Sequence, residues 1–398
     1  MVVVWDLLFV FSVFIILYTY VFYPLILITI SGVIQVFKDT AFVFNKEERR
    51  TRFSSLPEVT IIIAAYNEEK CIEERINNLL ALDYPSEKVR FLIGSDGSTD
   101  NTNAILNTFD HPIDHPNLTI HCFEQNRGKI NVLNDLMTKV KSPITIFSDA
   151  NTMFNADAIH HLVSHFESEK IGAVCGELHL IDPFSGDNKD NLYWKYEQAL
   201  KFHESRLNAL LGANGAIYAI RTETYLPLPT NTIIDDFCIV MNIAQKGYTV
   251  LYAPEAKAIE EIAPDLAEES SRRVRIGAGN YQAMMRLGWL LNPLQGSRFF
   301  SYISHKVLRW FVPHFMVLAL IFNLVLAVDH DLYRYTLLLQ ITFYLLAIVG
   351  LKIKSGNGIH IKLLQLIAFF VSMNFSLLRG FLKFLNKNLS ATWESTSR

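Results

Sequence analysis

The feature that most constrains the fold is a charge-free segment at residues 7–37. About 20 apolar residues are enough for a helix to cross a bilayer, so this segment predicts a transmembrane helix within residues 1–37. A cleaved signal peptide is disfavoured, because the apolar run is too long and no basic region precedes it. Three further apolar runs approach the length of a membrane helix, at residues 311–328, 335–351 and 363–378.

The central part of the chain carries most of the charge. Over the whole sequence 51% of the residues are hydrophobic and 19% are charged, which is too apolar a composition for a soluble enzyme of this size. Residues 57–285 have the composition and length of one globular domain. We therefore expect an N-terminal transmembrane helix (1–37), a juxtamembrane linker (38–56), this globular domain (57–285), an interfacial amphipathic segment (286–310), C-terminal transmembrane helices (311–382) and a tail (383–398).

Basic residues near the apolar runs indicate the orientation in the membrane. The segment KEERRTR (46–52) follows the first run and HKVLR (305–309) precedes the second, whereas the following loop, DHDLYR, is acidic on balance. The positive-inside rule then places the globular domain in the cytoplasm, on an inner or plasma membrane. Alternation places the tail outside although it is basic, which leaves open whether one of the last two runs is re-entrant or interfacial.

Strand-like and helix-like segments alternate in the globular domain. Short β-branched runs predict strands at residues 59–65, 89–95, 118–123, 144–149 and 171–177. Amphipathic patterns between them predict helices at residues 68–82, 99–109, 128–140 and 156–168. This alternation predicts right-handed crossovers and an α/β fold, with a mostly parallel sheet covered by helices on both faces.

Polar side chains follow four of the predicted strands. Glu68 comes after the first strand, Asp96 directly follows the second, Lys129 follows the third, Asp149 ends the fourth and Asn151 comes two residues later. Parallel sheets bind ligands at the carboxyl ends of their strands. Helix capping explains any one of these residues, but not four turns in succession. An acid can hold a ribose hydroxyl, and an acid with an oxygen ligand two residues on can hold a divalent cation, so a nucleotide diphosphate is the predicted ligand.

Several other classes of site are not supported by the sequence. It contains no G-x-x-x-x-G-K-[ST] phosphate loop, and no G-x-G-x-x-G follows the first strand. The four cysteines form no C-x-x-C pair, which favours reduced thiols over a zinc site or disulfides. No basic block with interleaved aromatic residues is present, so we expect no nucleic-acid partner.

Seven motifs in order resemble the membrane-bound family-two glycosyltransferases, which are related to polysaccharide synthases. They are AAYNEE, SDGSTD, NRGK, FSDANT, GANGAIYAIR, IIDDF and RRVRI, within residues 59–276. The resemblance implies a GT-A fold, a nucleotide-sugar donor and a Mg²⁺ or Mn²⁺ cofactor. It extends into the segment SHKVLRWFVPHF, where the chain is expected to enter the membrane.

The resemblance also implies roles for particular residues. Asp236 matches the general base, and Asp149 with Asn151 matches the metal-binding D-x-D motif. The implied donor-binding residues are Tyr66, Glu68, Asp96, Lys129, Asp149, Arg272 and Arg275. On the acceptor side we place Gly212, Asn214, Gly215 and Asp235. Glycines there would let an acceptor approach the backbone, whereas Asp235 could also serve as a helix cap.

Two departures from the family pattern bear on the reaction. Asn151 replaces the second acid of D-x-D, so the protein would offer the cation one carboxylate and one amide. Arg272 and Ile276 replace the Gln and Trp of the Q-x-x-R-W segment that marks processive polymerases. This second departure favours transfer of a single sugar.

The sequence therefore predicts an inverting hexosyl- or N-acetylhexosaminyltransferase. Its acceptor would be a lipid-linked glycan or a polysaccharide at the cytoplasmic face of the membrane, in contact with membrane lipids. One alternative is a processive synthase that polymerises and exports a glycan. A second alternative is a catalytically inactive, transferase-like scaffold subunit, which only Asn151 supports.

Overall fold

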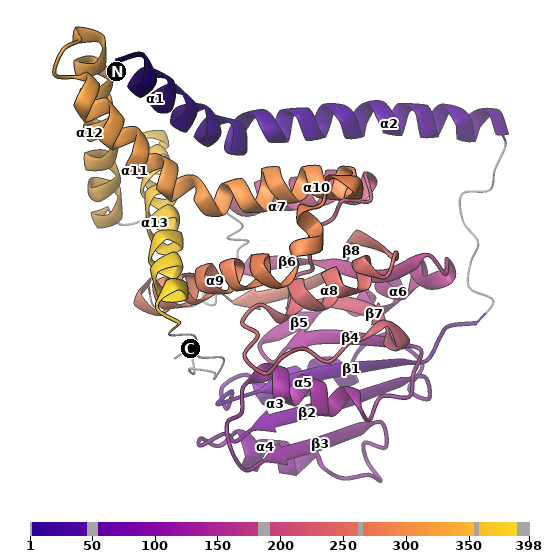
Figure 1. Ribbon diagram of the computed structural model, residues 1–398. Helices are drawn as coiled ribbons and strands as arrows, with labels where there is room; N and C mark the ends of the chain where they lie inside the picture. The colour runs from indigo at the N-terminus through magenta and orange to yellow at the C-terminus, as the bar shows by residue number, and fades with distance from the viewer. Residues whose placement is uncertain (1, 46–54, 182–191, 262–265, 354–357, 388–398) are drawn as a thin grey trace. The chain divides into compact units, whose positions relative to one another are not determined.

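The computed structural model describes residues 2–45, 55–181, 192–261, 266–353 and 358–387 (Figure 1). The chain divides into two compact units, each described separately below. The larger unit contains the described residues of segments 27–268 and 287–301. The smaller unit contains those of segments 1–26, 269–286 and 302–389.

The larger unit is built on one eight-stranded sheet, with the strand order β3-β2-β1-β4-β7-β6-β8-β5. The strands are β1 (Val59–Ala65), β2 (Val89–Asp96), β3 (Leu118–Phe123), β4 (Ile144–Asp149), β5 (Thr152–Phe154), β6 (Ile171–Ile181), β7 (Tyr218–Arg221) and β8 (Thr249–Glu261). β1 to β4 are parallel, β6 pairs with β8 in parallel, and β5 and β7 are antiparallel to their neighbours. The predicted mostly parallel sheet is confirmed.

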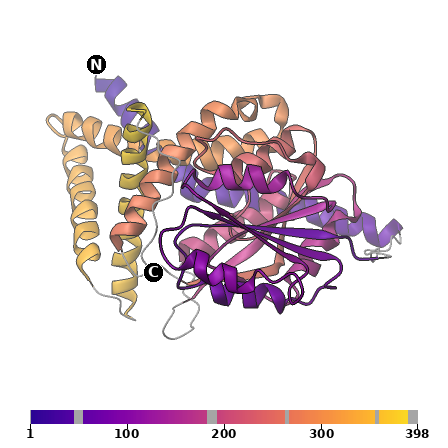
Figure 2. The same cartoon turned by 90° about the horizontal axis from the view of Figure 1, so that it is seen from below.

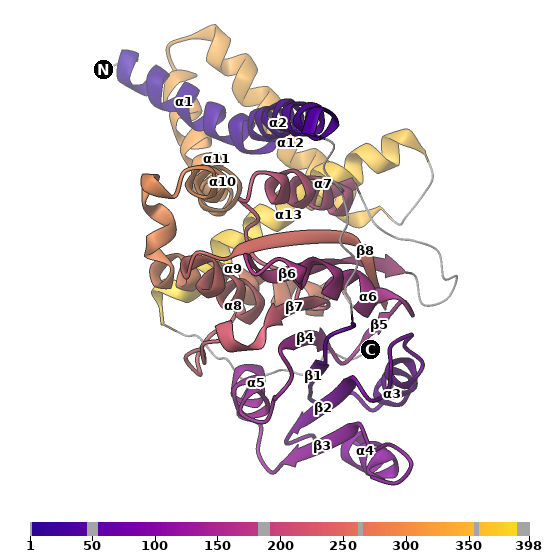
Figure 3. The same cartoon turned by 90° about the vertical axis from the view of Figure 1, so that its right-hand side faces the viewer.

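Helices cover both faces of this sheet. Figure 3 shows α3 (Ile72–Leu80) and α4 (Thr102–Phe109) on one face and α5 (Lys129–Met137) and α8 (Asp235–Gln245) on the other. The view from below in Figure 2 shows the first strands lying between these two helical layers. The unit also contains α6 (Ala158–Val163) and α7 (Leu192–Arg206). The strand order reverses between β1 and β4, and such a switch point is where an open α/β sheet binds ligands.

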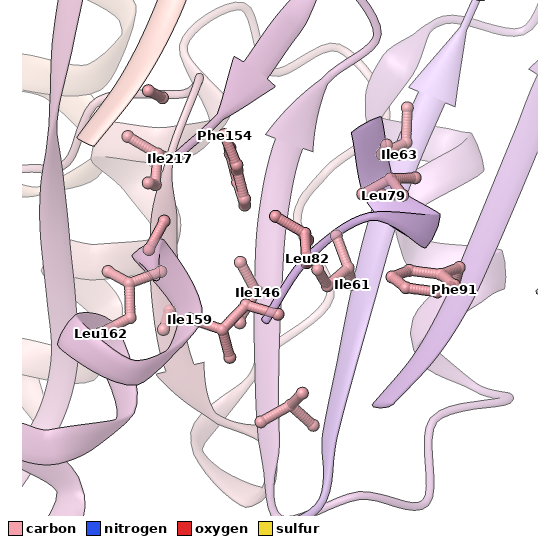
Figure 4. Packing of buried hydrophobic residues seen from close by; sticks show 14 of the residues in the cluster. Ile61, Ile63, Leu79, Leu82, Phe91, Ile146, Phe154, Ile159, Leu162 and Ile217 are labelled. Carbon is pink, nitrogen blue, oxygen red and sulfur yellow. The ribbon is translucent and has the colours of Figure 1, made fainter. Parts of the chain in front are cut away.

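The core explains why the β-branched runs form strands. Every residue of β1 is buried, as expected for a strand covered on both faces. Ile61 and Ile146 from neighbouring strands pack in one cluster with Leu79 of α3 and Phe154 of β5 (Figure 4). The end of β4 and the short strand β5 are therefore anchored by the same core as α3.

The N-terminal helical region is longer than the predicted membrane segment. α1 (Val2–Leu17) continues through a π-helical turn into α2 (Tyr23–Asn45), so the first residues of the predicted linker are helical. The rest of that linker, including basic segment 46–52, lies largely outside the described residues. Within the larger unit, Ser31 of α2 forms a hydrogen bond of 3.1 Å with His203 of α7.

The smaller unit is helical. It contains α1 and most of α9 (Leu266–Arg286), together with α11 (Leu308–Leu326), α12 (Asp331–Lys352) and α13 (Ile359–Leu385). The rings of Trp5 on α1 and Phe322 on α11 lie 5.5 Å apart. Asn323 of α11 forms side-chain hydrogen bonds with Thr336 and Gln340 of α12, the kind of polar contact that joins helices in lipid.

Four helical segments are long and apolar enough to cross a membrane. They are Val3–Phe44, Ser297–Leu326, Asp331–Lys352 and Ile359–Leu385. The prediction of one N-terminal and three C-terminal candidate spans is confirmed. The second of them begins at α10 (Ser297–Ser301), inside the segment predicted to be interfacial, because helical structure continues from α10 through a π-helical turn into α11.

Small residues bring α9 and α13 into close contact in the smaller unit. A Cβ atom added to Gly380 of α13 would lie 2.7 Å from the backbone nitrogen of Ala278, and Gly277 faces the same crossing. This contact sets the position of α9 against α13. The two arginines predicted to bind the donor, Arg272 and Arg275, precede it on α9.

We predict that Gly380→Ala lowers the thermal stability of the purified protein, because the added methyl group must push the two helix backbones apart. Overpacking of this kind costs about 1–3 kcal/mol. Thermal unfolding in detergent measures the effect. Gly32→Ala is the matched control, because a Cβ at Gly32 meets no atom within 4 Å. Equal melting temperatures for Gly380→Ala and the wild-type protein would contradict the assigned helix contact.

Candidate functional site

Three carboxylates gather around one lysine beside the carboxyl end of β4. The Nζ atom of Lys129, the first residue of α5, donates a hydrogen bond of 2.6 Å to Asp149 Oδ1. The same Nζ lies 3.6 Å from Asp235 Oδ2, and Asp236 also interacts electrostatically with it. Burial alone would lower the pKa of Lys129, but Asp149 and Asp235 raise it well above its ordinary value. The lysine therefore stays charged, and the cluster keeps an excess of negative charge.

Asp235 and Asp236 begin α8, where the helix dipole favours acidic side chains. Asp236 Oδ1 accepts a hydrogen bond of 2.7 Å from the backbone N–H of Phe237. Burial, followed by the negative charge of Asp235, raises the pKa of Asp236 to about 6. A half-buried carboxyl with a raised pKa is suited to proton transfer near neutral pH.

Gly215 lies between the metal-motif acid and the predicted base. A Cβ atom at Gly215 would lie 3.6 Å from Asp149 Oδ2 and 3.6 Å from Asp236 Oδ2. The absence of a side chain thus keeps the space between these two carboxylates open. Gly212 is required for a different reason. Its φ is +86°, and a Cβ there would lie 2.7 Å from the Phe237 ring. Asn214, between the two glycines, donates its backbone N–H to the Cys175 Sγ atom at 3.2 Å.

The turn from Asp149 to Asn151 joins β4 to β5. The Asn151 side chain donates its amide N–H to Glu260 Oε1 on β8. Strand pairing supports this contact, because Thr152 is opposite Glu260 in the β5–β8 ladder. The amide nitrogen is therefore directed at Glu260, and the Asn151 oxygen is the atom suited to face a cation.

This turn fits a divalent cation that also takes oxygen ligands from outside the protein. Among the residues that the structure describes, no group of three or more His, Cys, Asp or Glu side chains is arranged to hold a metal ion alone. Mg²⁺ is commonly bound by only one or two carboxylates together with substrate phosphates and water. One carboxylate from Asp149 and the amide oxygen of Asn151 fit that kind of shared site.

The Asp96 side chain binds the loop that precedes Lys129. This side chain is fully buried, and its two oxygens accept backbone N–H bonds from Arg127 (3.0 Å) and Gly128 (2.7 Å). Asp96 therefore fixes the loop that leads into Lys129. Its predicted contact with the nucleotide stays a prediction, and both carboxylate oxygens already have protein partners.

The loops after β1 and β2 are joined to each other. Asn67 has a φ of 55°, and its side-chain oxygen accepts the backbone N–H of Thr99 at 2.8 Å. α3 begins at Ile72, later than predicted, and it follows a turn in which the carbonyl of Glu68 accepts the N–H groups of Cys71 and Ile72. Tyr66 and Glu68 are half-buried at the start of this loop, consistent with a contribution to a binding surface.

Arg272 and Arg275 belong to the other compact unit. Both lie on α9, where Arg272 is exposed and Arg275 is half-buried. Their predicted contact with the donor diphosphate stays a prediction.

Glu260 is one site residue that sequence reasoning missed. It reaches Asn151 from β8, more than a hundred residues along the chain, and no local motif marks it. The available signal was indirect: a strand ending in two acids, Glu260 and Glu261, in a chain whose D-x-D motif lacks its second acid.

Comparison with family models gives two overlapping matches. The model described as glycosyl transferase family 2 matches residues 60–219. The model described as glycosyl transferase family group 2 matches residues 144–351, which is more than half of the chain. Both matched ranges include Asp149 and Gly215, and the second also includes Asp236 and extends through α11.

Comparison with curated proteins gives similar enzymes from two staphylococcal species. A poly-beta-1,6-N-acetyl-D-glucosamine synthase of Staphylococcus aureus (strain COL) is 26% identical over 234 residues, which are 57% of this chain and 56% of the relative. The enzyme of the same name from Staphylococcus epidermidis is 24% identical over 237 residues, 58% of this chain and 56% of the relative. The matched region thus spans little more than half the length of these relatives.

Among solved structures, the chain is similar to the mannosyltransferase PcManGT from Pyrobaculum calidifontis, determined in complex with GDP-Man and Mn²⁺. The TM-score is 0.65 and the identity 19%, over 95% of this chain and 99% of that one. This likeness concerns the fold, and the predicted GT-A fold with its apolar helices is confirmed.

We predict that Gly215→Ala lowers transfer activity strongly while leaving the melting temperature nearly unchanged. The added methyl group would make only ordinary contacts with Asp149 and Asp236, but it would enter the space between them. Initial rates and thermal unfolding measure the two effects. Gly247→Ala serves as a steric control, because nothing lies within 4 Å of its added Cβ, although its φ of +94° makes some loss of stability expected there. A Gly215→Ala protein with wild-type rates would show that no substrate occupies this space.

Proposed function

Because the chain belongs to glycosyltransferase family 2, we propose that it transfers a hexosyl or N-acetylhexosaminyl group from a nucleotide-diphosphate sugar with inversion. The observation that carries the proposal is the placement of Asp149 and Asp236 on the two sides of Gly215. One carboxylate is paired with a lysine and suited to a metal-diphosphate. The other is half-buried, has a raised pKa and is suited to accept a proton.

In the proposed reaction, Asp236 takes the proton of an acceptor hydroxyl as its oxygen attacks the anomeric carbon. The bond from that carbon to the diphosphate breaks, and the leaving diphosphate takes the bonding electrons. Lys129, held between Asp149 and Asp235, supplies positive charge beside the leaving group. A Mg²⁺ or Mn²⁺ ion held by Asp149 and Asn151 would act as a Lewis acid and stabilise the negative charge that develops on the leaving diphosphate.

Other residues have supporting roles in this proposal. Tyr66 and Glu68 would contact the nucleotide, and Asp96 would act through the loop that it holds in front of Lys129. Arg272 and Arg275 would bind the diphosphate, since guanidinium groups pair well with phosphate oxygens. Gly212, Asn214, Gly215 and Asp235 would form the acceptor side.

We further propose that the acceptor is a lipid-linked glycan or a polysaccharide at the cytoplasmic face of the inner membrane. Four candidate membrane spans in a chain with a nucleotide-sugar fold support a membrane-associated acceptor. The cytoplasmic orientation is supported by the basic residues near the apolar segments, at 46–52 and 305–309.

A processive synthase is the second candidate, and the curated relatives favour it because they are named as synthases of a polymer. The Arg272 and Ile276 replacements in the Q-x-x-R-W segment favour single transfer instead. Product length separates the two candidates. An inactive scaffold is disfavoured, because Lys129, Asp149 and Asp236 are assembled in one cluster.

The function is tested by supplying the membrane-embedded protein with a panel of nucleotide-sugars and measuring released nucleoside diphosphate and labelled lipid or polymer. We expect release with at least one donor, loss of release in excess chelator, and recovery with Mg²⁺ or Mn²⁺. Full activity in chelator would exclude the metal assignment. No release with any donor, in membranes that contain lipid-linked acceptors, would count against the transferase proposal.

We predict that Asp236→Asn abolishes transfer, because the amide keeps the shape of the side chain but cannot accept the proton. A positioned base contributes about 10²–10⁴-fold in rate. Binding of the nucleotide-sugar should be nearly unchanged, and the wild-type product should have the inverted anomeric configuration. Asp135→Asn is the matched control, since Asp135 is a partly exposed residue paired with Arg127.

The wild-type pH profile provides a second readout for Asp236. A base with a pKa of about 6 is protonated below that pH, so kcat/KM should fall about tenfold per pH unit as the pH decreases below about 6. Retained anomeric configuration, or an Asp236→Asn enzyme within a few fold of wild type, would overturn the assignment.

A further inference from the structure

One face of α3 contacts the turn that carries Asp149 and Asn151. Cys71, Arg75 and Asn78 are spaced by four and three residues, so they lie on the same side of the helix and its N-terminal cap. Each of them touches a different point of the segment from Ser148 to Phe154. Cys71 makes the weakest contact, with its Sγ atom 3.9 Å from the carbonyl oxygen of Ala150.

Asn78 holds the end of this segment. Its Nδ2 atom donates to the Phe154 carbonyl at 2.9 Å, and its Oδ1 atom accepts the Phe154 backbone N–H at 2.9 Å. Both backbone groups of one residue on β5 are therefore bound by a single side chain. Such a pair of bonds fixes the backbone position that follows the turn.

Arg75 binds Ser148 at the beginning of the segment and also binds Asn78, which holds the end of the segment. Its Nη2 atom donates to Ser148 Oγ at 2.9 Å, and its Nη1 atom donates to Asn78 Oδ1 at 2.7 Å. Its guanidinium carbon also lies 4.5 Å from the centre of the Phe154 ring. Ser148 and Phe154 flank the turn, so one connected set of side chains spans both of its ends.

The charge of Arg75 is unusual for its location. The side chain is fully buried beside Ile72, Ile76 and Leu79, and within the described part of the chain no carboxylate forms an ion pair with it. Burial lowers the pKa of Arg75 to about 9, and the negative charge of Asp149 acts in the opposite direction. The group therefore stays charged at neutral pH. An apolar side chain would be the less costly choice for stability alone at such a position.

We propose that Arg75 and Asn78 are positioning residues, which hold the Asp149–Asn151 turn in the geometry that binds a divalent cation together with a nucleotide diphosphate. The buried guanidinium binds Ser148 directly before the metal-motif acid, and Asn78 binds the backbone of Phe154 at the end of β5. This inference rests on the proposed function of the turn. Outer contacts that orient metal ligands typically change metal affinity by about 10–100-fold.

The test uses Arg75→Met in the full-length protein and measures the affinity for Mn²⁺ in the presence of UDP or GDP by electron paramagnetic resonance. We expect Mn²⁺ affinity to fall by about 10-fold or more. Arg221→Met is the matched control. Arg221 donates to the carbonyls of Phe166, Ser168 and Ile171, but it pairs with Ile144 at the opposite end of β4 from Asp149. That variant should lose stability and keep wild-type Mn²⁺ affinity.

Ser148→Ala is the second variant, in case Arg75→Met does not fold. It removes the hydroxyl that receives Arg75 Nη2 and leaves the arginine in place. We expect Mn²⁺ affinity to fall in this variant too, but by a smaller factor. The inference is overturned when a folded Arg75→Met protein keeps wild-type affinity for Mn²⁺. When Arg75→Met does not fold, wild-type Mn²⁺ affinity in Ser148→Ala overturns it instead. A wild-type protein that binds neither Mn²⁺ nor nucleotide would overturn the proposed function, and this inference with it.

Discussion

The concentration of negative charge where β4 ends and α8 begins is the constraint on which the rest of the site depends. Asp149, Asp235 and Asp236 repel one another, and one lysine between them does not neutralise all three. Like charges stay this close only when a rigid framework holds them, because the repulsion favours their separation. The sheet provides that framework: β4 is a central strand, and Asp96 fixes the loop that presents Lys129.

The environments of the two principal carboxylates divide the chemistry between them. Asp149 is partly exposed and accepts a hydrogen bond from an ammonium group, which favours its ionised form. Asp236 is partly removed from solvent and lies beside another acid, and both effects favour its protonated form and raise its pKa. A pair of acids whose pKa values are pushed apart can serve two different roles in one reaction. On the proposed function, Gly215 separates the two roles in space by leaving room for substrate between the two carboxylates.

Local patterns predicted the strands well and the connections less well. β1, β3 and β4 begin and end where their predicted runs do. β1 and β4 are buried along nearly all of their length, whereas only Leu118 of β3 is buried. The first predicted helix was too long at its start, because Glu68 and Cys71 form the loop that joins β1 to α3. Arg75 and Glu260 were not identified from the sequence. Their roles depend on contacts with Ser148 and Asn151 that only the folded sheet creates.

Asn151 stands where the D-x-D motif has its second acid, and this replacement changes how the turn can bind a cation. With Asp at that position, two carboxylates would face the ion directly, but here the second carboxylate, Glu260, binds the amide N–H instead. On the proposed function, the negative charge of Glu260 stays in the site but lies one contact away from the cation. A cation held by one carboxylate and one amide needs further oxygen ligands, and a diphosphate supplies them. On the proposed function, the metal and the nucleotide-sugar therefore complete each other's binding site, and each should bind more tightly when the other is present.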